Sequence, residues 1–303
     1  MGRIEVVETA PRDGLQNEAV VLTVEQRLEL ITRLVDAGAT RVEAVSFANP
    51  ARVPAMAGAE ELMERVPRRP GVSYAGLVMN ERGLRRALDS GVDEVDLVVV
   101  ATDTFCRRNQ NTGTAEAASS AVELAARARA AGLTTTITIG ASFGCPFEGE
   151  VPTDRLAQVL RTVAEAEPTE IALADTIGVA VPRDVRARVA LARELVPGSR
   201  LRLHLHDTRN TATANALAGV EEGVEVLDTS VGGAGGCPFA PAATGNLATE
   251  DLVYALRRSG IETGHDLEKL RATAEWLGGL LGHRLPSALL AAGDFPAGVG
   301  ADH

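Results

Sequence analysis

Two histidines near residue 205 are the first side chains in this sequence that suggest chemistry. The stretch LHLHDT, residues 203–208, places His204 and His206 two positions apart in an apolar segment. Side chains at positions i and i+2 of a strand point to one face, so both imidazoles would lie side by side. Paired imidazoles near a carboxylate suit a divalent metal ion. Core histidines bonded to backbone carbonyls are the alternative, but two of only five histidines at one place favour a metal site.

A charged segment near the N-terminus supplies the carboxylate. PRDGLQNE, residues 11–18, follows an apolar run and carries Arg12, Asp13 and Gln16. One interpretation is a solvated turn with a charged rim. The other is the rim of an active site, in which Asp13 joins the two histidines and Arg12 adds a permanent positive charge.

A glycine-rich loop lies further along the chain. GGAGGCPFAPAATGN, residues 232–246, contains Cys237 and ends at Asn246. It is either a flexible crossing or a lid whose glycines let backbone amides approach a ligand. Asn246 offers a neutral oxygen ligand to the metal. Cys237 is either a packing residue or a thiol whose pKa is lowered by neighbouring cations.

These residues need a scaffold that brings them together. Eight apolar runs alternate with Ala, Leu, Glu and Arg segments of helical spacing, such as residues 23–37, 153–165 and 182–195. The pattern predicts the α/β class and a (β/α)₈ TIM barrel. An open doubly wound sheet is less consistent, because the turn after the first run lacks a GxGxxG phosphate loop. The expected strands are Ile4–Glu8, Arg41–Phe47, Val72–Val78, Glu94–Val100, Thr134–Ile139, Glu170–Ala174, Arg200–Leu205 and Val224–Ser230.

We expect one catalytic domain over residues 1–303. The barrel would cover about residues 3–260, and a helical and irregular segment would follow over about 261–303. Catalytic groups of such barrels sit at the carboxyl ends of the strands. Polar side chains gather at those ends, namely Arg12, Asp13, Gln16, Glu43, Ser46, Asn49, Asp175, Thr176, His204, His206 and Asp207.

Composition restricts the class of protein. Hydrophobic residues make up 45% of the chain and aromatic residues only 3%, which indicates the aliphatic core of a helix-covered parallel sheet. A net charge of −11 disfavours a nucleic-acid partner. Cys106, Cys145 and Cys237 form no CxxC pair, which is typical of a reducing compartment, and we expect the first two to pack. No apolar run approaches the ~20 residues of a membrane span, so we expect a cytoplasmic protein without a membrane partner.

Taken together, the motifs resemble a known family. PRDGLQNE, VEAVSF, GCPFEGE, ALADTIGV, HLHDT and GGCPFAPAATGNLATEDLVY occur in the order found in the 3-hydroxy-3-methylglutaryl-CoA (HMG-CoA) lyase family of metal-dependent barrel lyases. The resemblance extends over about residues 3–280. Leu15 and Thr208 favour the lyases over the related acyl-transferring synthases, which carry RDGEQ and HxHND-type motifs and extra C-terminal domains.

The resemblance implies roles for these residues. Asp13, His204, His206 and Asn246 would bind Mg²⁺ or Mn²⁺, and Arg12 would stabilise an enolate oxygen. Cys237 would cover the site and take part in proton transfer, with His204 and Asp175 as further proton carriers. The reaction would be a retro-Claisen cleavage of an acyl-CoA, and the assembly a homodimer. The surrounding polar shell would consist of Gln16, Glu43, Ser46, Thr138, Asp175 and Thr176.

Two departures from the family pattern concern the substrate. The family carries Arg-Gly-Tyr on the fifth strand, where this chain has Thr136, Ile137 and Thr138, which implies a roomier and less charged acyl pocket. After HDT the family has Tyr-Gly-Gln, where this chain begins with Arg209, either a replacement cation or a solvent-facing side chain. Citramalyl-CoA therefore stands beside HMG-CoA as a candidate substrate. A non-catalytic metal-binding barrel and an aldolase acting on free acids are the other functional alternatives.

Overall fold

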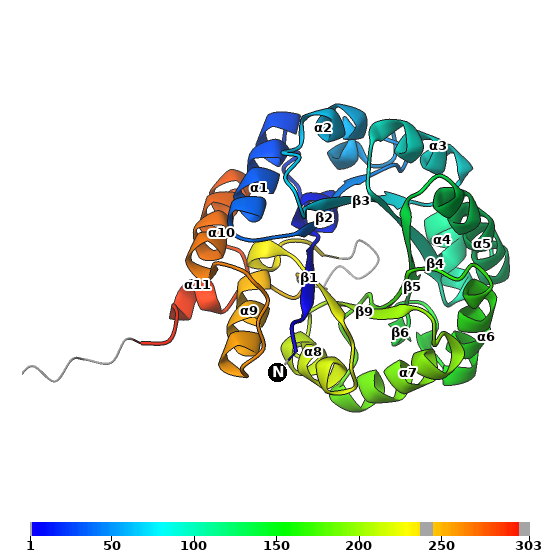
Figure 1. The fold of residues 1–303 in the computed structure, drawn as a ribbon. Helices are drawn as coiled ribbons and strands as arrows, with labels where there is room; N and C mark the ends of the chain where they lie inside the picture. Colours follow the sequence, from blue (N-terminus) through cyan, green and yellow to red (C-terminus); the bar gives the residue numbers. More distant parts are fainter. Residues whose placement is uncertain (1, 237–244, 297–303) are drawn as a thin grey trace, which may run out of the picture.

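Eight parallel strands close into a barrel in this computed structural model, which describes residues 2–236 and 245–296 (Figure 1). Neighbouring strands are paired in the order β1-β10-β9-β8-β5-β4-β3-β2 and back to β1. The predicted (β/α)₈ barrel is therefore confirmed, and each strand lies within two residues of its expected ends. The barrel strands are β1 (Glu5–Glu8), β2 (Arg41–Ser46), β3 (Ser73–Val78), β4 (Glu94–Val100), β5 (Thr134–Gly140), β8 (Glu170–Asp175), β9 (Arg200–Leu205) and β10 (Val226–Thr229).

Helices surround the barrel as an outer ring (Figure 1). Local signals set their starts: the Thr23 side chain and Gln26 form a capping box before α1, and Pro182 opens α7. None of the helices in the described ranges is long and apolar enough to cross a membrane. The helices are α1 (Val24–Asp36), α2 (Ala59–Arg65), α3 (Glu81–Ser90), α4 (Asp103–Gln110), α5 (Thr114–Ala130), α6 (Thr153–Ala164), α7 (Pro182–Leu195), α8 (Ala212–Glu221), α9 (Thr249–Arg258), α10 (Leu267–Leu281) and α11 (Leu289–Ala292).

Several short elements depart from the sequence-based expectation. The PRDG segment, which the sequence predicts as a turn, is a π-helix, η1 (Ala10–Gly14). After β5 the chain forms an antiparallel hairpin of β6 (Gly144–Cys145) and β7 (Gly149–Glu150). Two 3₁₀ turns complete the list, η2 (Pro54–Met56) and η3 (Val231–Gly233).

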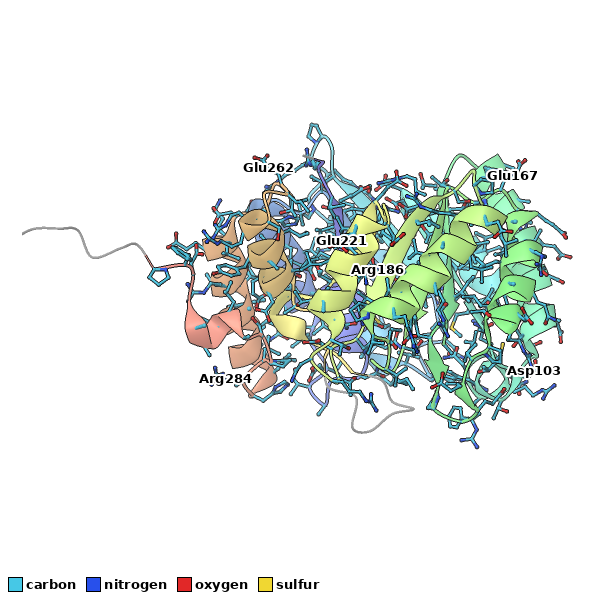
Figure 2. The ribbon with its side chains drawn as sticks, turned by 90° about the horizontal axis from the view of Figure 1, so that it is seen from below. Asp103, Glu167, Arg186, Glu221, Glu262 and Arg284 are labelled. Carbon is cyan, nitrogen blue, oxygen red and sulfur yellow. The ribbon has the colours of Figure 1, made fainter. Side chains whose placement is uncertain are left out.

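The two ends of the barrel are chemically different. Figure 2 views the barrel from the side, with Glu167, just before β8, at the upper edge and Asp103, just after β4, at the lower edge. Because all barrel strands are parallel, the lower edge collects their carboxyl ends. η1 and η3 follow β1 and β10 directly, so both lie at this edge.

The barrel interior contains paired charges as well as aliphatic side chains. Nη2 of Arg41 on β2 lies 2.6 Å from Oε2 of Glu94 on β4 and 2.6 Å from Oε1 of Glu170 on β8. All three residues are buried. Burial alone would lower the pKa of Arg41, but its bonds to Glu170 and Glu94 outweigh burial and raise it. This cluster joins three strands that are far apart in the sequence.

Removal of the central cation should destabilise the fold strongly. Arg41→Met leaves the carboxylates of Glu94 and Glu170 buried without their main partner, which typically costs about 3–5 kcal/mol of unfolding free energy. Urea unfolding followed by circular dichroism measures this. Arg33→Met, which removes the exposed pair with Glu29, should change stability by less than about 1 kcal/mol. Equal losses in the two variants would show that the buried cluster does not hold the barrel together.

Candidate active and metal-binding site

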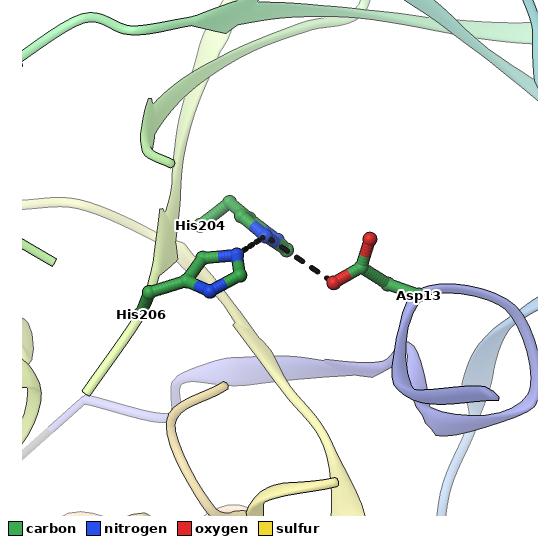
Figure 3. Close-up of side chains that lie close together, drawn as sticks. All are labelled: Asp13, His204 and His206. Carbon is green, nitrogen blue, oxygen red and sulfur yellow. Dashed lines mark hydrogen bonds and ion pairs between the residues drawn. The ribbon is translucent and has the colours of Figure 1, made fainter. Parts of the chain in front are cut away.

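Asp13, His204 and His206 converge at the carboxyl-terminal edge of the barrel (Figure 3). One candidate ligand atom from each lies within 4.8 Å of the other two. The Nε2 atoms of the two histidines are 3.2 Å apart, and Nε2 of His204 is 3.8 Å from Oδ2 of Asp13. The imidazoles thus share one face, as the spacing predicts, and the carboxylate faces them from the loop after β1.

Asp13 is placed by the backbone of η1. The carbonyl of Thr9 accepts the N–H groups of Arg12, Asp13 and Gly14 at 3.1, 2.8 and 3.2 Å, which winds the segment tightly after β1. A Cβ at position 14 would lie 2.6 Å from Oγ of Ser230. Glycine is therefore required for η1 to approach the end of β10.

Asn246 reaches the site through backbone pairing with β9. His206 and Asn246 form an isolated antiparallel bridge, and the N–H of Leu247 donates to the carbonyl of Leu205 at 2.9 Å. Nδ2 of Asn246 donates to Oδ2 of Asp13 at 2.9 Å and to the carbonyl of Ala234 at 3.1 Å. The pairing brings a fourth polar group to the three converging residues.

The residues present fit a divalent cation. Oδ1 of Asn246 and Nδ1 of His206 are buried and have no hydrogen-bond partner among residues 2–236 and 245–296, and an unsatisfied buried polar atom is costly. Two imidazole nitrogens, a carboxylate and an amide oxygen are donors that a hard or borderline divalent ion accepts. Asn246 is not oriented to coordinate a cation, because its amide nitrogen rather than its oxygen faces Asp13.

The protonation states also suit a cation. Burial, followed by the charge of His204, lowers the pKa of His206 to about 4, so this imidazole is neutral at physiological pH. Burial would raise the pKa of Asp13, but Arg12 and then the two histidines lower it below its usual range. A neutral imidazole and an ionised carboxylate are the forms that coordinate metals.

Behind His204 lies a carboxylate that the sequence-based prediction missed. Oδ2 of Asp228 on β10 is 3.0 Å from Nδ1 of His204, its partner in the strand register. Asp228 also bonds the buried guanidinium of Arg202. Burial would lower the pKa of His204, but the bond to Asp228 and the charge of Asp13 raise it. The signal in the sequence is an aspartate directly after VEVL (residues 224–227), within the expected strand Val224–Ser230.

Arg12 lies between two carboxylates at the edge of the site. Its Nη1 is 2.6 Å from Oδ1 of Asp13, and its Nη2 is 2.7 Å from Oε2 of Glu43. Burial alone would lower the pKa of Arg12, but Glu43 and then Asp13 outweigh burial and raise it. The site therefore contains a fixed positive charge held in one orientation.

A cavity of about 1400 Å³ opens at this edge of the barrel. Asp175 is fully buried and does not line it; its two oxygens accept the N–H groups of Val179 and Ala180 at 3.0 and 2.9 Å. Glu43 lies behind Arg12, and Cys237 falls outside the described residues. Cys106 and Cys145 are buried, as expected. The expected site residues that line the cavity are Arg12, Asp13, Gln16, Ser46, Thr138, Thr176, His204 and His206.

The expected changes in the acyl pocket need correction. Thr138 lines the cavity and donates to Oδ1 of Asp96 at 2.7 Å, but Thr136 donates to Oε1 of Glu170 at 3.1 Å, in the buried ionic cluster. Only one of the two threonines therefore shapes the pocket. Arg209 is not a replacement cation in the cavity, because its guanidinium binds the carbonyls of residues 177 and 178. It fastens the loop that follows β8.

Comparison with known proteins agrees with this geometry. The family model described as HMGL-like matches residues 3–277. The chain belongs to the HMGL-like family. The resemblance stated from the motifs is thereby confirmed over nearly the whole chain.

Individual members of the HMGL-like family are similar over their full length. An (R)-citramalyl-CoA lyase of Chloroflexus aurantiacus is 41% identical over 97% of this chain and 96% of its own. A hydroxymethylglutaryl-CoA lyase of Bacillus subtilis is 38% identical over 94% and 95%. The structure of an HMG-CoA lyase from Acinetobacter baumannii in complex with coenzyme A and 3-methylmalate is 34% identical, with a TM-score of 0.93 over 97% and 96%.

Loss of the carboxylate behind His204 should weaken metal binding. Asp228→Asn keeps an acceptor near Nδ1 but removes the charge that orients the imidazole, and such changes typically cost about 10- to 100-fold in metal affinity. Titration of the metal-free protein with Mn²⁺, followed by electron paramagnetic resonance, measures the dissociation constant. An unchanged constant would contradict a supporting role for Asp228.

The carboxyl under the pocket predicts a pH dependence of stability. Burial raises the pKa of Asp96 to about 7, although Arg202 opposes this. Between pH ~4 and ~7 the unfolded chain has released a proton that the folded protein still holds, so stability falls as pH rises through this window and then levels off. Glu8 and Glu250, with pKa values raised to about 7 by burial, act in the same direction.

Asp96→Asn should therefore reduce the loss of unfolding free energy between pH 5 and pH 8. Urea unfolding at the two pH values gives the difference for each variant. Asp89→Asn, at an exposed carboxylate of α3, should leave the wild-type difference unchanged. The same fall in the Asp96 variant as in wild type would show that this carboxyl is ionised throughout the range.

Proposed function

We propose that the protein is a divalent-metal-dependent carbon–carbon lyase that cleaves a 3-hydroxyacyl-CoA by a retro-Claisen reaction. The principal candidate substrate is 3-hydroxy-3-methylglutaryl-CoA, which would give acetoacetate and acetyl-CoA. The observation that carries the proposal is the convergence of Asp13, His204 and His206 beside the fixed charge of Arg12, in one cavity at the catalytic edge of the barrel. The names of the relatives in the HMGL-like family support the reaction class.

Asp13, His204, His206 and Asn246 would hold the cation, Mg²⁺ or Mn²⁺. When bound, such an ion lowers the pKa of a coordinated hydroxyl and polarises a neighbouring oxygen. The donor set supports this assignment, as does Oδ1 of Asn246, which has no partner in the described part of the chain. A non-catalytic barrel would not need the charged Arg12 oriented beside the same donors.

The remaining steps depend on side chains that surround the substrate. The proton leaves the tertiary hydroxyl, the bond between the carbinol carbon and the thioester α-carbon breaks, and a ketone forms. The electron pair moves into the enolate of acetyl-CoA, which then takes up a proton at carbon. Arg12 would face the enolate oxygen. One such donor typically stabilises the transition state by about 3–4 kcal/mol.

The proton carriers are assigned from their position. His204 lines the cavity and is held by Asp228, whereas both oxygens of Asp175 are occupied by backbone N–H groups. We therefore assign a loop-holding role to Asp175. Because Nδ1 of His204 bonds Asp228 and its Nε2 belongs to the proposed metal site, His204 would act in proton transfer through a group bound beside it. For Cys237, a role in covering the site and in proton transfer rests on the sequence resemblance.

Basic residues on the cavity wall support a CoA thioester as substrate. Although the chain carries a net charge of −11, cationic side chains gather on one side of the cavity, where they would attract the phosphates of CoA. A free-acid aldolase would not need such a wall. The arginines that line the cavity, apart from Arg12, are Arg52, Arg82, Arg85, Arg86 and Arg108.

A second candidate substrate is citramalyl-CoA, which would give pyruvate and acetyl-CoA. Its carboxylate lies on the carbinol carbon and can chelate a metal together with the hydroxyl. In HMG-CoA the carboxylate lies one carbon further away and needs a donor on the pocket wall. Thr138 on that wall is already bonded to Asp96 at 2.7 Å. The 41% identity to an (R)-citramalyl-CoA lyase supports the same alternative.

The assembly and setting of the enzyme are part of the proposal. We expect a single catalytic domain that works as a homodimer in the cytoplasm, as the family resemblance implies. Light scattering on the purified protein measures the oligomeric state.

The decisive experiment compares the two substrates. Protein stripped with a chelator should release acetyl-CoA only after Mn²⁺ or Mg²⁺ is restored, and HMG-CoA and citramalyl-CoA are assayed in parallel. Arg12→Gln should lower kcat by about 10²–10³, the effect of losing one oxyanion donor, while Arg33→Gln on the outer surface should not. Release from citramalyl-CoA alone would favour the second candidate. No release from either substrate, with Mn²⁺ still bound, would exclude both.

A further inference from the structure

We infer that Glu8 is a positioning residue of the metal site, although it lies outside the cavity. Glu8 ends β1 and is fully buried. Its Oε1 accepts the N–H of Ala10 at 2.9 Å and the N–H of Val231 at 3.0 Å. Its Oε2 accepts the hydroxyl of Thr249 at 2.7 Å. One carboxylate thus bonds three separate segments of the chain.

Each of these segments leads to a group of the site. Ala10 is the first residue of η1, which carries Arg12 and Asp13. Thr249 is the first residue of α9 and follows Asn246 by three positions. The contacts span 2 and 241 positions in the sequence. Glu8 therefore fixes the spacing between the two segments that supply the Asp13 carboxylate and the Asn246 amide.

The third contact holds the turn between β10 and Asn246. Val231 opens η3, and the carbonyl of Ala234, at the end of that turn, accepts from Nδ2 of Asn246. Both oxygens of Glu250 reinforce the turn by accepting the N–H of Gly232 at 3.1 and 3.0 Å. Glu8 and Glu250 thus accept the backbone N–H groups of Ala10, Val231 and Gly232, which lie outside the strands.

Geometry rather than charge explains what Glu8 does. It does not line the cavity, so it cannot bind the substrate or the ion directly. A glutamine in its place still offers one oxygen to Ala10 and Val231, and its amide can donate to Oγ1 of Thr249. An alanine leaves two buried N–H groups without an acceptor and frees η1 to move relative to α9.

The inference rests on the proposed metal site, and Mn²⁺ affinity tests it without an activity assay. The full chain, stripped of metal, is titrated with Mn²⁺ and followed by electron paramagnetic resonance. Glu8→Ala should bind Mn²⁺ about 10- to 100-fold more weakly than wild type, the usual effect of losing a group that orients ligands. Glu8→Gln should remain within about threefold of wild type, since it keeps the three contacts.

A matched control separates positioning from general stability. Glu94→Ala also removes a buried carboxylate, but this one lies at the start of β4, at the end of the barrel opposite the site. Arg41 keeps Glu170 as its partner in this variant. Its Mn²⁺ affinity should match that of wild type even if its melting temperature falls. Should Glu8→Ala fail to fold, Thr249→Val replaces it, since it removes one of the three contacts with little change of shape and should weaken Mn²⁺ binding at least threefold.

Several results would overturn the inference. Wild-type affinity in Glu8→Ala, or in Thr249→Val if the alanine variant does not fold, would show that the contacts do not position the ligands. Affinity in Glu8→Gln as weak as in Glu8→Ala would mean that the charge matters instead. Failure of wild type to bind Mn²⁺ is a different outcome, because it would contradict the proposed metal site itself.

Discussion

Pairing of buried charges along the barrel axis is the constraint on which this structure depends. At one end Arg41 bonds Glu94 and Glu170, and further toward the carboxyl edge Arg202 bonds Asp228. Each cation lies between carboxylates from other strands, since an unpaired charge inside the barrel would be costly. The pairs therefore link β2 to β4 and β8, and β9 to β10, inside the barrel.

The same network supports the candidate site. Asp228, bonded by Arg202, holds one imidazole of the histidine pair, and Glu43 holds the guanidinium of Arg12. Side chains that are oriented from behind lose little freedom when they bind a cation or an oxyanion, which is the general advantage of a preorganised site. The acidic side chains of Asp13, Glu43 and Asp228 would also attract a divalent cation to the site.

Substrate selection depends on fewer residues than the reaction does. The four groups proposed for the metal and the positive charge of Arg12 suit any 3-hydroxyacyl-CoA. The proposed choice between the two substrates depends on the cavity wall at Thr138, which donates to Asp96. This division agrees with a family in which relatives of similar identity carry the names of two different lyases.

The sequence by itself determined the barrel, the shared face of His204 and His206, and the gathering of polar groups at one edge, because these follow from local periodicity and strand direction. Only the tertiary structure decided the partners across strands. Asp228 meets His204 through the register of β10 on β9, and Glu8 bonds Val231 across 223 positions. Whether Thr176 or Asp175 faces the cavity depends on the pleat at the end of β8. Register and pleat are set by how all strands pack together, which no local pattern encodes.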